Sequence, residues 1–367
     1  MNYQERVASC QERLAGGDAD ALVLFPSVDM EYLSGFTDEP MERHLFLVVA
    51  QDDDPVFVAP ELYESHIEDD AWVEDIRTYG DGGDPLAVVT DVSAELGIQG
   101  GRVLVDDRMW AQFTLDLRGA LPDADFGLAS EVLAPLRMRK DSREVDALRR
   151  AGAAADAAMQ DVRALGSDAI GMTEAELAGY VEDRLAAHGG TGTSFDPIVG
   201  SGPNGARPHH RHGDREITRG DPVVFDFGTR IDGYPSDQTR TVVFAGDPPA
   251  AFETVHEVVA EAQQAACETV QPGIPAEAVD AAARDVIADA GYGDQFIHRT
   301  GHGLGLEVHE EPYVVSGNDQ TLQEGMVFSV EPGVYVDGEF GVRIEDIVVV
   351  TADGCERLND TSRNWRL

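Results

Sequence analysis

From about residue 141 onward, the chain passes twice through the same order of elements, two helices followed by two strands. Asp141 and Glu144 have the spacing of an N-cap and its capping-box partner, so the first helix begins there. The repeat is one of architecture and not of sequence. It predicts an α+β domain of two halves related by a pseudo-twofold axis, with the strands in one mostly antiparallel sheet. The expected helices lie at about 141–163, 173–188, 249–270 and 275–290, and the expected strands at about 222–231, 235–244, 325–336 and 341–351.

The segment before this repeat has a different texture. Short apolar runs alternate with helical patterns over about the first 135 residues, which is typical of an α/β domain. A chain of 367 residues is also longer than the chains that usually fold around a single hydrophobic core. We therefore expect an α/β N-terminal domain at 1–135 and an α+β catalytic domain at 136–367. The expected N-terminal strands are Leu22–Phe25, His44–Ala50, Pro55–Ala59 and Arg102–Asp106.

The charge balance excludes several kinds of partner. The chain holds 69 Asp and Glu against 27 Lys and Arg, a formal net charge of -42. Nucleic acid and anionic membranes would be repelled, and the basic residues are scattered. Acids spread along every segment, with Lys140 as the single lysine, resemble a protein of a salt-loving cytoplasm. No leader or membrane span is indicated, so we expect a cytoplasmic protein. Three distant cysteines support neither a disulfide framework nor a thiolate zinc site.

Acidic residues interrupt the expected strands in matching places. Asp226 and Asp237 lie in the first strand pair, with the turn signal Asp232-Gly233 near their midpoint. Folding this hairpin brings the two carboxylates close together. Like charges facing each other across strands are destabilising unless a cation lies between them.

The second strand pair repeats the arrangement. Glu331 and Glu345 lie on its two arms, and Asp337-Gly338 lies at their midpoint. Two divalent ions would balance the four carboxylates, and His302, between two glycines, is a candidate fifth ligand. An oxygen-rich set with one imidazole favours Mn²⁺ or Co²⁺, with Fe²⁺ and Zn²⁺ as alternatives.

These residues carry a family resemblance. Their contexts are Asp-Phe-Gly, Ser-Asp-Gln-Thr-Arg-Thr, Gly-His-Gly-Leu-Gly, Glu-Pro-Gly and Arg-Ile-Glu-Asp. In type, order and spacing they resemble the metal set of the pita-bread metallopeptidases over about residues 138–352. Upstream, the run from Tyr32 to Phe36 resembles the N-terminal domain of the Xaa-Pro dipeptidase, Xaa-Pro aminopeptidase and creatinase branch. Creatinase lacks the metal ligands, whereas all five are present here.

The resemblance implies a role for each ligand. Asp226 would chelate one metal, Asp237 and Glu345 would bridge the two, and His302 and Glu331 would hold the other. Glu331 would also act as general base toward the water that attacks a peptide carbonyl.

Further residues match the surroundings of this site in the family. The resemblance implies that His209, His298 and His309 contact the substrate carbonyl, its terminus or the tetrahedral intermediate. Arg343 matches an arginine near the product-side carboxylate, and a structural ion pair is the equal alternative. His210 and His212 are expected in a solvated loop, with a His-rich metal tract as the weaker alternative.

The resemblance implies a binuclear-metal enzyme that hydrolyses the bond between an N-terminal residue and proline, either in dipeptides or in longer peptides. It also implies a homodimer. One alternative is a related hydrolase acting on a non-peptide amide, such as an ectoine-type solute. The other is a non-catalytic binding module, against which the intact ligand set argues.

Overall fold

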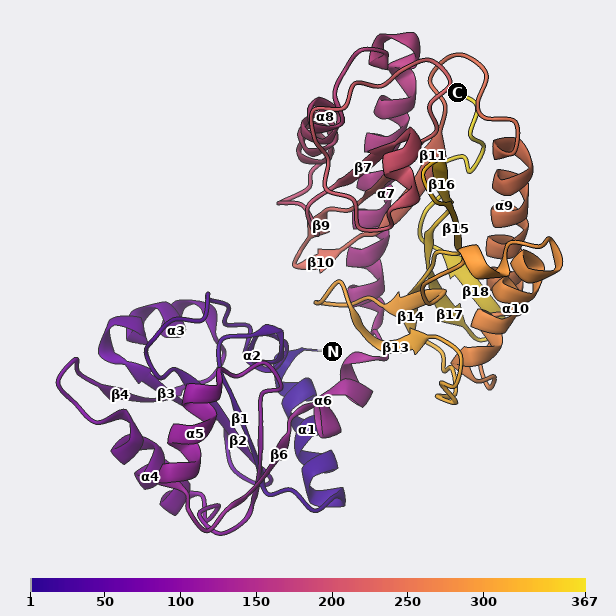
Figure 1. The fold of residues 1–367 in the computed structure, drawn as a ribbon. Helices are drawn as coiled ribbons and strands as arrows, with labels where there is room; N and C mark the ends of the chain where they lie inside the picture. The colour runs from indigo at the N-terminus through magenta and orange to yellow at the C-terminus, as the bar shows by residue number, and fades with distance from the viewer. Residues whose placement is uncertain (1) are drawn as a thin grey trace. The chain divides into compact units, whose positions relative to one another are not determined.

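The computed structural model describes residues 2–367 and contains two compact units. One unit ends at Arg137 and the other spans Met138–Leu367. Figure 1 shows both units, with the chain coloured from end to end. None of the helices in the described residues combines the length and apolar character needed to cross a membrane.

The N-terminal unit is built on one mixed six-stranded sheet, in the order β4-β3-β2-β1-β5-β6. Its strands are β1 (Ala21–Leu24), β2 (Phe46–Ala50), β3 (Val56–Pro60), β4 (Asp75–Tyr79), β5 (Arg102–Val105) and β6 (Asp125–Leu128). Its helices are α1 (Tyr3–Gly16), α2 (Val28–Ser34), α3 (Glu64–Asp70), α4 (Pro85–Glu95), α5 (Ala111–Ala120) and α6 (Ser130–Arg137). The expected α/β class is confirmed. The two edge strands β4 and β6 were not predicted, because neither carries a buried apolar run.

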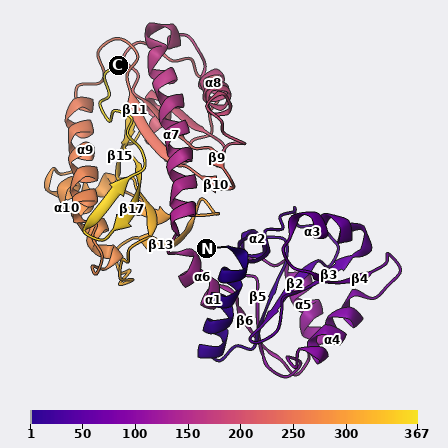
Figure 2. The same cartoon turned by 180° about the vertical axis from the view of Figure 1, so that it is seen from behind.

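The core of this unit lies between the sheet and two helices. Val89 and Val92 of α4 pack with Phe113 and Leu117 of α5 against buried side chains of the strands. Helix α1 lies along the other face, as the view from behind shows (Figure 2). Both faces of the sheet are therefore covered, which explains why its central strands read as continuous apolar runs.

The C-terminal unit begins with the first predicted half. Asp141 caps α7 and forms the predicted capping box with Glu144. Helices α7 and α8 pack against a three-stranded antiparallel sheet in the order β11-β8-β7. The elements are α7 (Ser142–Ala164), α8 (Glu174–Ala187), β7 (Ile198–Ser201), β8 (Val223–Phe227), β9 (Arg230–Ile231), β10 (Tyr234–Pro235) and β11 (Gln238–Val242).

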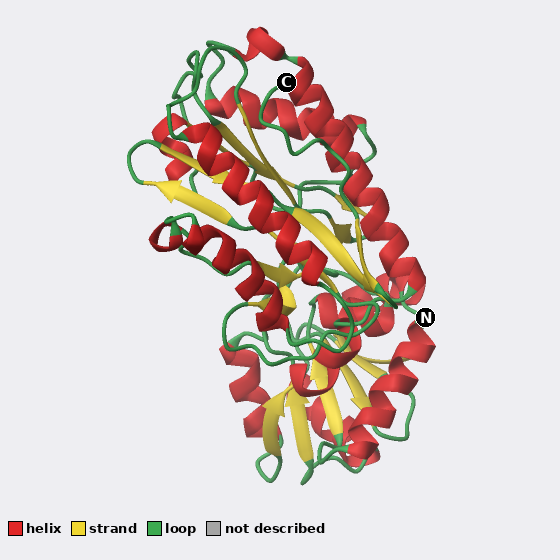
Figure 3. Ribbon diagram, turned by 90° about the vertical axis from the view of Figure 1, so that its right-hand side faces the viewer, coloured by secondary structure: helices red, strands yellow, loops and turns green. Residues whose placement is uncertain are grey.

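The second half repeats this order. Helices α9 and α10 pack against a five-stranded sheet in the order β13-β12-β14-β17-β18. The elements are α9 (Phe252–Thr269), α10 (Ala276–Asp289), β12 (Gly301–Gly303), β13 (Glu310–Val314), β14 (Val327–Val330), β15 (Gly333–Val336), β16 (Phe340–Arg343), β17 (Asp346–Thr351) and β18 (Gly354–Arg357). Helices of the C-terminal unit cover its strands in the view that distinguishes helices from strands by colour (Figure 3). Short 3₁₀ turns complete the chain at Glu61–Tyr63, Gly166–Ala169, Gly202–Ala206 and Gly293–Gln295.

The predicted single sheet is wrong, because each expected long strand is broken into two. β8 stops before Gly228, where a Cβ atom would lie 1.8 Å from the carbonyl oxygen of Ser236. β14 stops at Val330, and Pro332, which follows Glu331, has no N–H for a ladder bond. The tips of the two hairpins therefore form separate ribbons, β9 with β10 and β15 with β16.

Hydrogen bonds join the two halves beside these breaks. The backbone N–H of Glu345 donates to the carbonyl of Thr239 at 3.1 Å. The N–H of Arg343 donates to Thr241 Oγ1 at 3.1 Å. The broken ends of the hairpins, which carry the predicted acids, therefore meet at the junction of the halves.

Candidate metal centre

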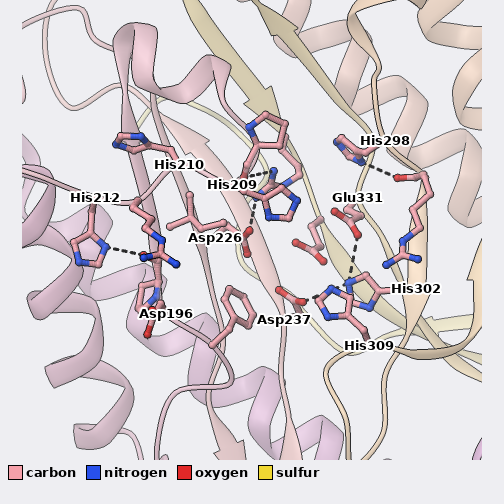
Figure 4. A pocket seen from close by; sticks show the side chains of 18 residues that line it. Asp196, His209, His210, His212, Asp226, Asp237, His298, His302, His309 and Glu331 are labelled. Carbon is pink, nitrogen blue, oxygen red and sulfur yellow. Dashed lines mark hydrogen bonds and ion pairs between the residues drawn. The ribbon is translucent and has the colours of Figure 1, made fainter. Parts of the chain in front are cut away.

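The five predicted ligands come from five separate segments at this junction. Asp226 lies in β8 and Asp237 directly precedes β11. His302 is the middle residue of β12, Glu331 directly follows β14, and Glu345 lies between β16 and β17. Asp237, Glu331 and Glu345 thus lie beside the strand breaks, whereas Asp226 and His302 lie within strands. Asp226, Asp237, His302 and Glu331 lie close together in Figure 4.

The turn signals position the first pair of acids as predicted. Asp232 has φ 50° and Gly233 has φ 81°, the positive values of a two-residue type I′ turn. This turn sets Ile231 opposite Tyr234. In the neighbouring ladder, Asp226 of β8 lies opposite Thr239 of β11.

The two glycines beside His302 are required by close packing. A Cβ atom on Gly301 would lie 1.9 Å from the carbonyl oxygen of Ser329, and one on Gly303 would lie 2.3 Å from that of Glu311. His302 Nδ1 lies 3.2 Å from the carbonyl oxygen of Gly303. Since a carbonyl can only accept, Nδ1 carries the proton and Nε2 presents a lone pair to the cluster.

The ligand atoms converge in a buried space. One ligand atom each from Asp237, His302 and Glu345 lie within 4.8 Å of one another. His302 Nε2 is 3.4 Å from Glu331 Oε1 and 3.7 Å from Asp237 Oδ2. Three of the carboxylate oxygens are buried without a hydrogen-bond partner in residues 2–367: Asp226 Oδ1, Asp237 Oδ1 and Glu345 Oε1. Buried polar atoms of this kind are rare unless an ion or water satisfies them.

The protein atoms alone leave these acids under strong mutual repulsion. Burial, followed by the charge of Glu345, holds the pKa of Asp237 well above its usual range. Burial and the charge of Glu331 do the same to the pKa of Glu345. The pKa of Glu331 rises to about 7, chiefly through burial. Burial likewise lowers the pKa of His302 to about 3, so the imidazole is neutral and able to bind a metal.

The neighbouring Asp346 shows how the same chain treats a structural acid. Its carboxylate is fully buried and receives Arg240 Nη2 at 2.8 Å and Arg363 Nε at 2.7 Å. Gln263 adds a further hydrogen bond at 2.8 Å. Asp237 has no such arginine. An acid buried for structure is thus neutralised by protein cations, whereas the acid cluster fits divalent ions supplied from outside.

Of the five predicted ligands, Asp226 alone has an arginine at contact distance within residues 2–367. Arg343 Nη2 bonds Asp226 Oδ2, and both side chains are buried. Arg343 also donates to Tyr335 Oη at 2.8 Å and to Thr239 Oγ1 at 3.0 Å. Oδ1 of Asp226 therefore stays without a hydrogen-bond partner within residues 2–367. In this structure Arg343 forms an ion pair, the structural one of the two roles expected for it.

A cavity of about 560 Å³ opens onto the cluster. It is lined by the five ligands and by all four further residues predicted from the family pattern, His209, His298, His309 and Arg343. Figure 4 shows His209, His298 and His309 around Asp226, Asp237 and Glu331. His209 and His309 are exposed, and the His309 ring packs on that of His302 with centroids 4.1 Å apart.

His298 is tied to its surroundings through both ring nitrogens. Nδ1 lies 2.7 Å from the carbonyl oxygen of Arg299, so it carries the proton. Nε2 then accepts from Tyr335 Oη at 2.9 Å. Burial lowers the pKa of His298 to about 4, which keeps the ring neutral. A continuous chain of bonds runs from Asp226 through Arg343 and Tyr335 to His298.

His210 and His212 lie in a loop, as expected, but both are only partly exposed and each has a partner in the protein. His210 Nε2 lies 2.8 Å from Glu174 Oε2, and only 12% of its side chain is exposed. His212 Nδ1 lies 2.9 Å from the carbonyl oxygen of Pro197. Glu174 is fully buried and also accepts from Ser201 Oγ at 2.6 Å. These contacts fix the loop that carries His209.

Three residues around the site were not singled out from the sequence. Thr239 Oγ1 donates to Glu345 Oε2 at 2.6 Å, Tyr335 connects Arg343 to His298, and Arg299 lines the cavity. A threonine or tyrosine in a strand is an ordinary β-residue. Only the motif Thr-Arg-Thr after Asp237 could have directed attention to Thr239.

Comparisons with known proteins agree with this geometry. Residues 146–352 match the model of metallopeptidase family M24, and residues 6–139 match the creatinase/prolidase N-terminal domain. The chain belongs to metallopeptidase family M24. This M24 protein therefore has the fold class predicted from its sequence, an α/β N-terminal domain followed by a pita-bread domain.

Similar M24 proteins align over nearly their whole length. The chain is 43% identical to the probable dipeptidase PepE of Mycobacterium tuberculosis, over 98% of this chain and 94% of that protein. It is 38% identical to the Xaa-Pro dipeptidase of Lactobacillus helveticus, over 97% of each. Among solved structures, the recombinant prolidase of Thermococcus sibiricus superposes with a TM-score of 0.93 at 38% identity, over 100% of this chain and 99% of that one.

The repulsion within the cluster predicts that metal removal destabilises this M24 protein. At fixed high salt, we expect a chelator to lower the unfolding midpoint by roughly 5–10 °C and added Mn²⁺ to restore it. Thermal unfolding followed by circular dichroism measures this shift. An Asp237→Asn variant serves as control, because a weakened site should respond less to the chelator. An unchanged midpoint in the wild type would show that no ion is integrated into the fold.

Proposed function

We propose that this protein hydrolyses the peptide bond between an N-terminal residue and proline, with two divalent metal ions as cofactor. The observation that carries the proposal is the cluster of four acids and His302 at a cavity lined by five further histidines, among them His209, His298 and His309. The relatives named Xaa-Pro dipeptidase and prolidase support the substrate class. The tertiary amide before proline resists general peptidases, so a dedicated site is the usual solution.

The residues that would hold the ions are Asp226, Asp237, His302, Glu331 and Glu345. When bound, the ions would supply Lewis-acid polarisation of the amide carbonyl and a lowered pKa for the attacking water. Asp226, Asp237 and Glu345 each have a buried oxygen without a hydrogen-bond partner within residues 2–367, and these oxygens would be available to the ions.

Glu331 is the proposed general base. Ser329 Oγ donates to Glu331 Oε1 at 3.2 Å, which leaves Oε2 to take the proton of the attacking water. The same carboxyl then gives this proton to the proline nitrogen as the amide bond breaks. Arg343 holds Asp226 in place and, through Tyr335, also orients the ring of His298.

The exposed histidines are placed to meet the substrate. His209 and His309 line the cavity and can donate or accept hydrogen bonds at a peptide carbonyl or terminus. Both ring nitrogens of His298 are already hydrogen-bonded in this structure. His298 would therefore act on the substrate through Tyr335, or directly once its hydrogen bond to Tyr335 is broken.

Some finer features belong to the same proposal. Mn²⁺ or Co²⁺ suits the oxygen-rich ligand set better than Fe²⁺ or Zn²⁺. The net charge of -42 suits a protein that works in the concentrated salt of a halophile's cytoplasm. A homodimer follows from the family resemblance. Sedimentation at several protein concentrations in concentrated KCl tests whether the protein is a stable homodimer under the salt conditions of such a cytoplasm.

Product analysis of matched peptides tests the function. In concentrated KCl with Mn²⁺, we expect Leu-Pro to be cleaved and Leu-Ala to be left intact. A longer peptide, Leu-Pro-Ala-Ala, separates the two activities in the proposal. Cleavage confined to the dipeptide defines a dipeptidase, and release of leucine from the longer peptide defines an aminopeptidase.

Other outcomes would contradict the proposal. If no proline peptide is cleaved although two metals are bound, the substrate is a different amide, such as an ectoine-type solute. If the protein purified without chelator binds no metal, the non-catalytic binding module is the correct alternative.

Replacement of Glu331 tests the general base. Glu331→Gln removes the proton acceptor and keeps the side-chain shape, so we expect kcat to fall about 10²- to 10⁴-fold while at least one metal stays bound. Glu339→Gln, the same change in the exposed turn between β15 and β16, is the matched control. Steady-state kinetics and metal analysis of both variants measure these effects. Full activity in Glu331→Gln would remove Glu331 from the role.

A further inference from the structure

Three arginines line the cavity: Arg211, Arg299 and Arg343. Arg343 is fully engaged, because its guanidinium bonds Asp226, Tyr335 and Thr239 and is buried. A substrate anion could recruit Arg343 only by breaking this structural network. The other two arginines are therefore the cations open to a ligand.

Arg299 has an unusual environment for a half-buried cation. Its guanidinium carbon lies 4.2 Å from the ring centroid of Tyr313, in β13. No hydrogen bond or ion pair of this guanidinium exists within residues 2–367. Stacking on an aromatic face restrains the guanidinium plane and leaves its N–H donors directed outward from the edge. The group is thus held in position with its hydrogen-bonding capacity unused.

The missing partner is not explained by a shortage of acids. The chain has 69 acidic residues for 27 basic ones, and Arg149, Arg215 and Arg240 all pair with carboxylates. An arginine beside a cluster of four carboxylates that pairs with none of them is oriented by its surroundings toward the cavity. Its free donors match a carboxylate in the bidentate geometry that guanidinium favours.

Arg299 also lies on the metal-ligand side of the cavity. It precedes His302 by three residues, and its backbone carbonyl accepts the Nδ1 proton of His298. Its positive charge contributes to lowering the pKa of both Glu331 and His302, against the effect of burial on Glu331. An anion bound by Arg299 would therefore lie next to the reacting amide.

We propose that Arg299, supported by the ring of Tyr313, is the specificity residue that binds a carboxylate of the substrate. This inference rests on the proposed peptidase function and narrows its substrate class. The carboxylate has two sources, the free C-terminus of a dipeptide or the side chain of an acidic first residue. Arg211 is the rival cation, with an exposed side chain and no aromatic support.

A double-mutant cycle between enzyme and substrate tests the proposal. The enzymes are the wild type, Arg299→Gln and Arg211→Gln, and the first substrate pair is Leu-Pro with its C-terminal amide, Leu-Pro-NH₂. If the C-terminus is the source, Arg299→Gln lowers kcat/KM for Leu-Pro about 10- to 100-fold, mostly through KM. The same variant cleaves Leu-Pro-NH₂ as the wild type does, because the partner of Arg299 is already absent.

A second substrate pair distinguishes the other source. If the acidic side chain is bound, Arg299→Gln lowers kcat/KM for Glu-Pro and leaves Gln-Pro unchanged, and the amide pair shows no coupling. In either pair, a loss of kcat/KM in Arg299→Gln that is confined to the substrate with the carboxylate supports Arg299; we call this dependence coupling. Coupling that appears in Arg211→Gln and is absent in Arg299→Gln assigns the role to Arg211 and overturns the proposal.

Binding of small ligands supplies a readout that does not depend on turnover. Proline, prolinamide, glutamate and glutamine contain no peptide bond, and calorimetry on the metal-loaded protein measures their affinities. We expect the preference for the carboxylate member of one pair to disappear in Arg299→Gln. If wild type and variant show the same preferences in both pairs, the proposal fails even where Xaa-Pro cleavage is confirmed. If Xaa-Pro cleavage fails but the preference depends on Arg299, only the proposed substrate is wrong.

Two further variants guard against misfolding. Arg299→Lys keeps the charge without the bidentate fork, so carboxylate preference should fall to an intermediate value. Tyr313→Leu removes the aromatic support and should weaken the carboxylate preference. Tyr313→Phe keeps the aromatic ring and should keep the preference. Unfolding midpoints equal to that of the wild type show that these effects arise in the site. Equal carboxylate preference in Tyr313→Leu and wild type would remove Tyr313 from the proposal.

Discussion

Electrostatic repulsion between three buried carboxylates and the partly exposed Glu331 is the interaction on which the rest of the C-terminal unit depends. Two lie on a hairpin of one half of the repeat and two on a hairpin of the other, so the repulsion acts across the junction of the halves. Burial raises the pKa of Asp237, Glu331 and Glu345, and three carboxylate oxygens of the set have no partner within residues 2–367. Bound divalent cations would offset this repulsion and so hold the two halves together.

The surrounding protein is arranged so that this charge is not neutralised from within. Asp346, the neighbour of Glu345, is paired with Arg240 in a fully buried contact. Removing one partner of such a pair is costly, so this pair fixes the position of the segment that carries Glu345. Arg343 in turn holds Asp226, and Arg299 stacks on Tyr313 at the cavity wall without an ion-pair partner in residues 2–367. Arg240 and Arg343 thus order the segments around the site, and neither pairs with Asp237, Glu331 or Glu345.

The sequence predicts the parts of this arrangement that depend on local pattern. The capping box at Asp141 and the positive-φ turn at Asp232 follow from short-range chemistry, and the structure has both. The acids that interrupt apolar strands are also a local pattern, and they indicate the predicted metal ligands. The division into several sheets depends in part on the close approach of Gly228 to Ser236, which no pattern in the sequence indicates, whereas the missing N–H of Pro332 is a local signal that the prediction of one long strand overlooked. The partners of His210 and Arg299 depend on contacts between residues distant in sequence, and no spacing encodes them.

The central claim is that two divalent ions complete the fold at the junction of the halves. Metal analysis of protein purified in concentrated salt without chelator tests it most directly. The account predicts about two divalent ions per chain in the wild type and a clear loss in Asp237→Asn. Asp337→Asn, the same change in the exposed turn between β15 and β16, should keep both ions. A wild-type protein without bound metal, folded and stable, would contradict the account.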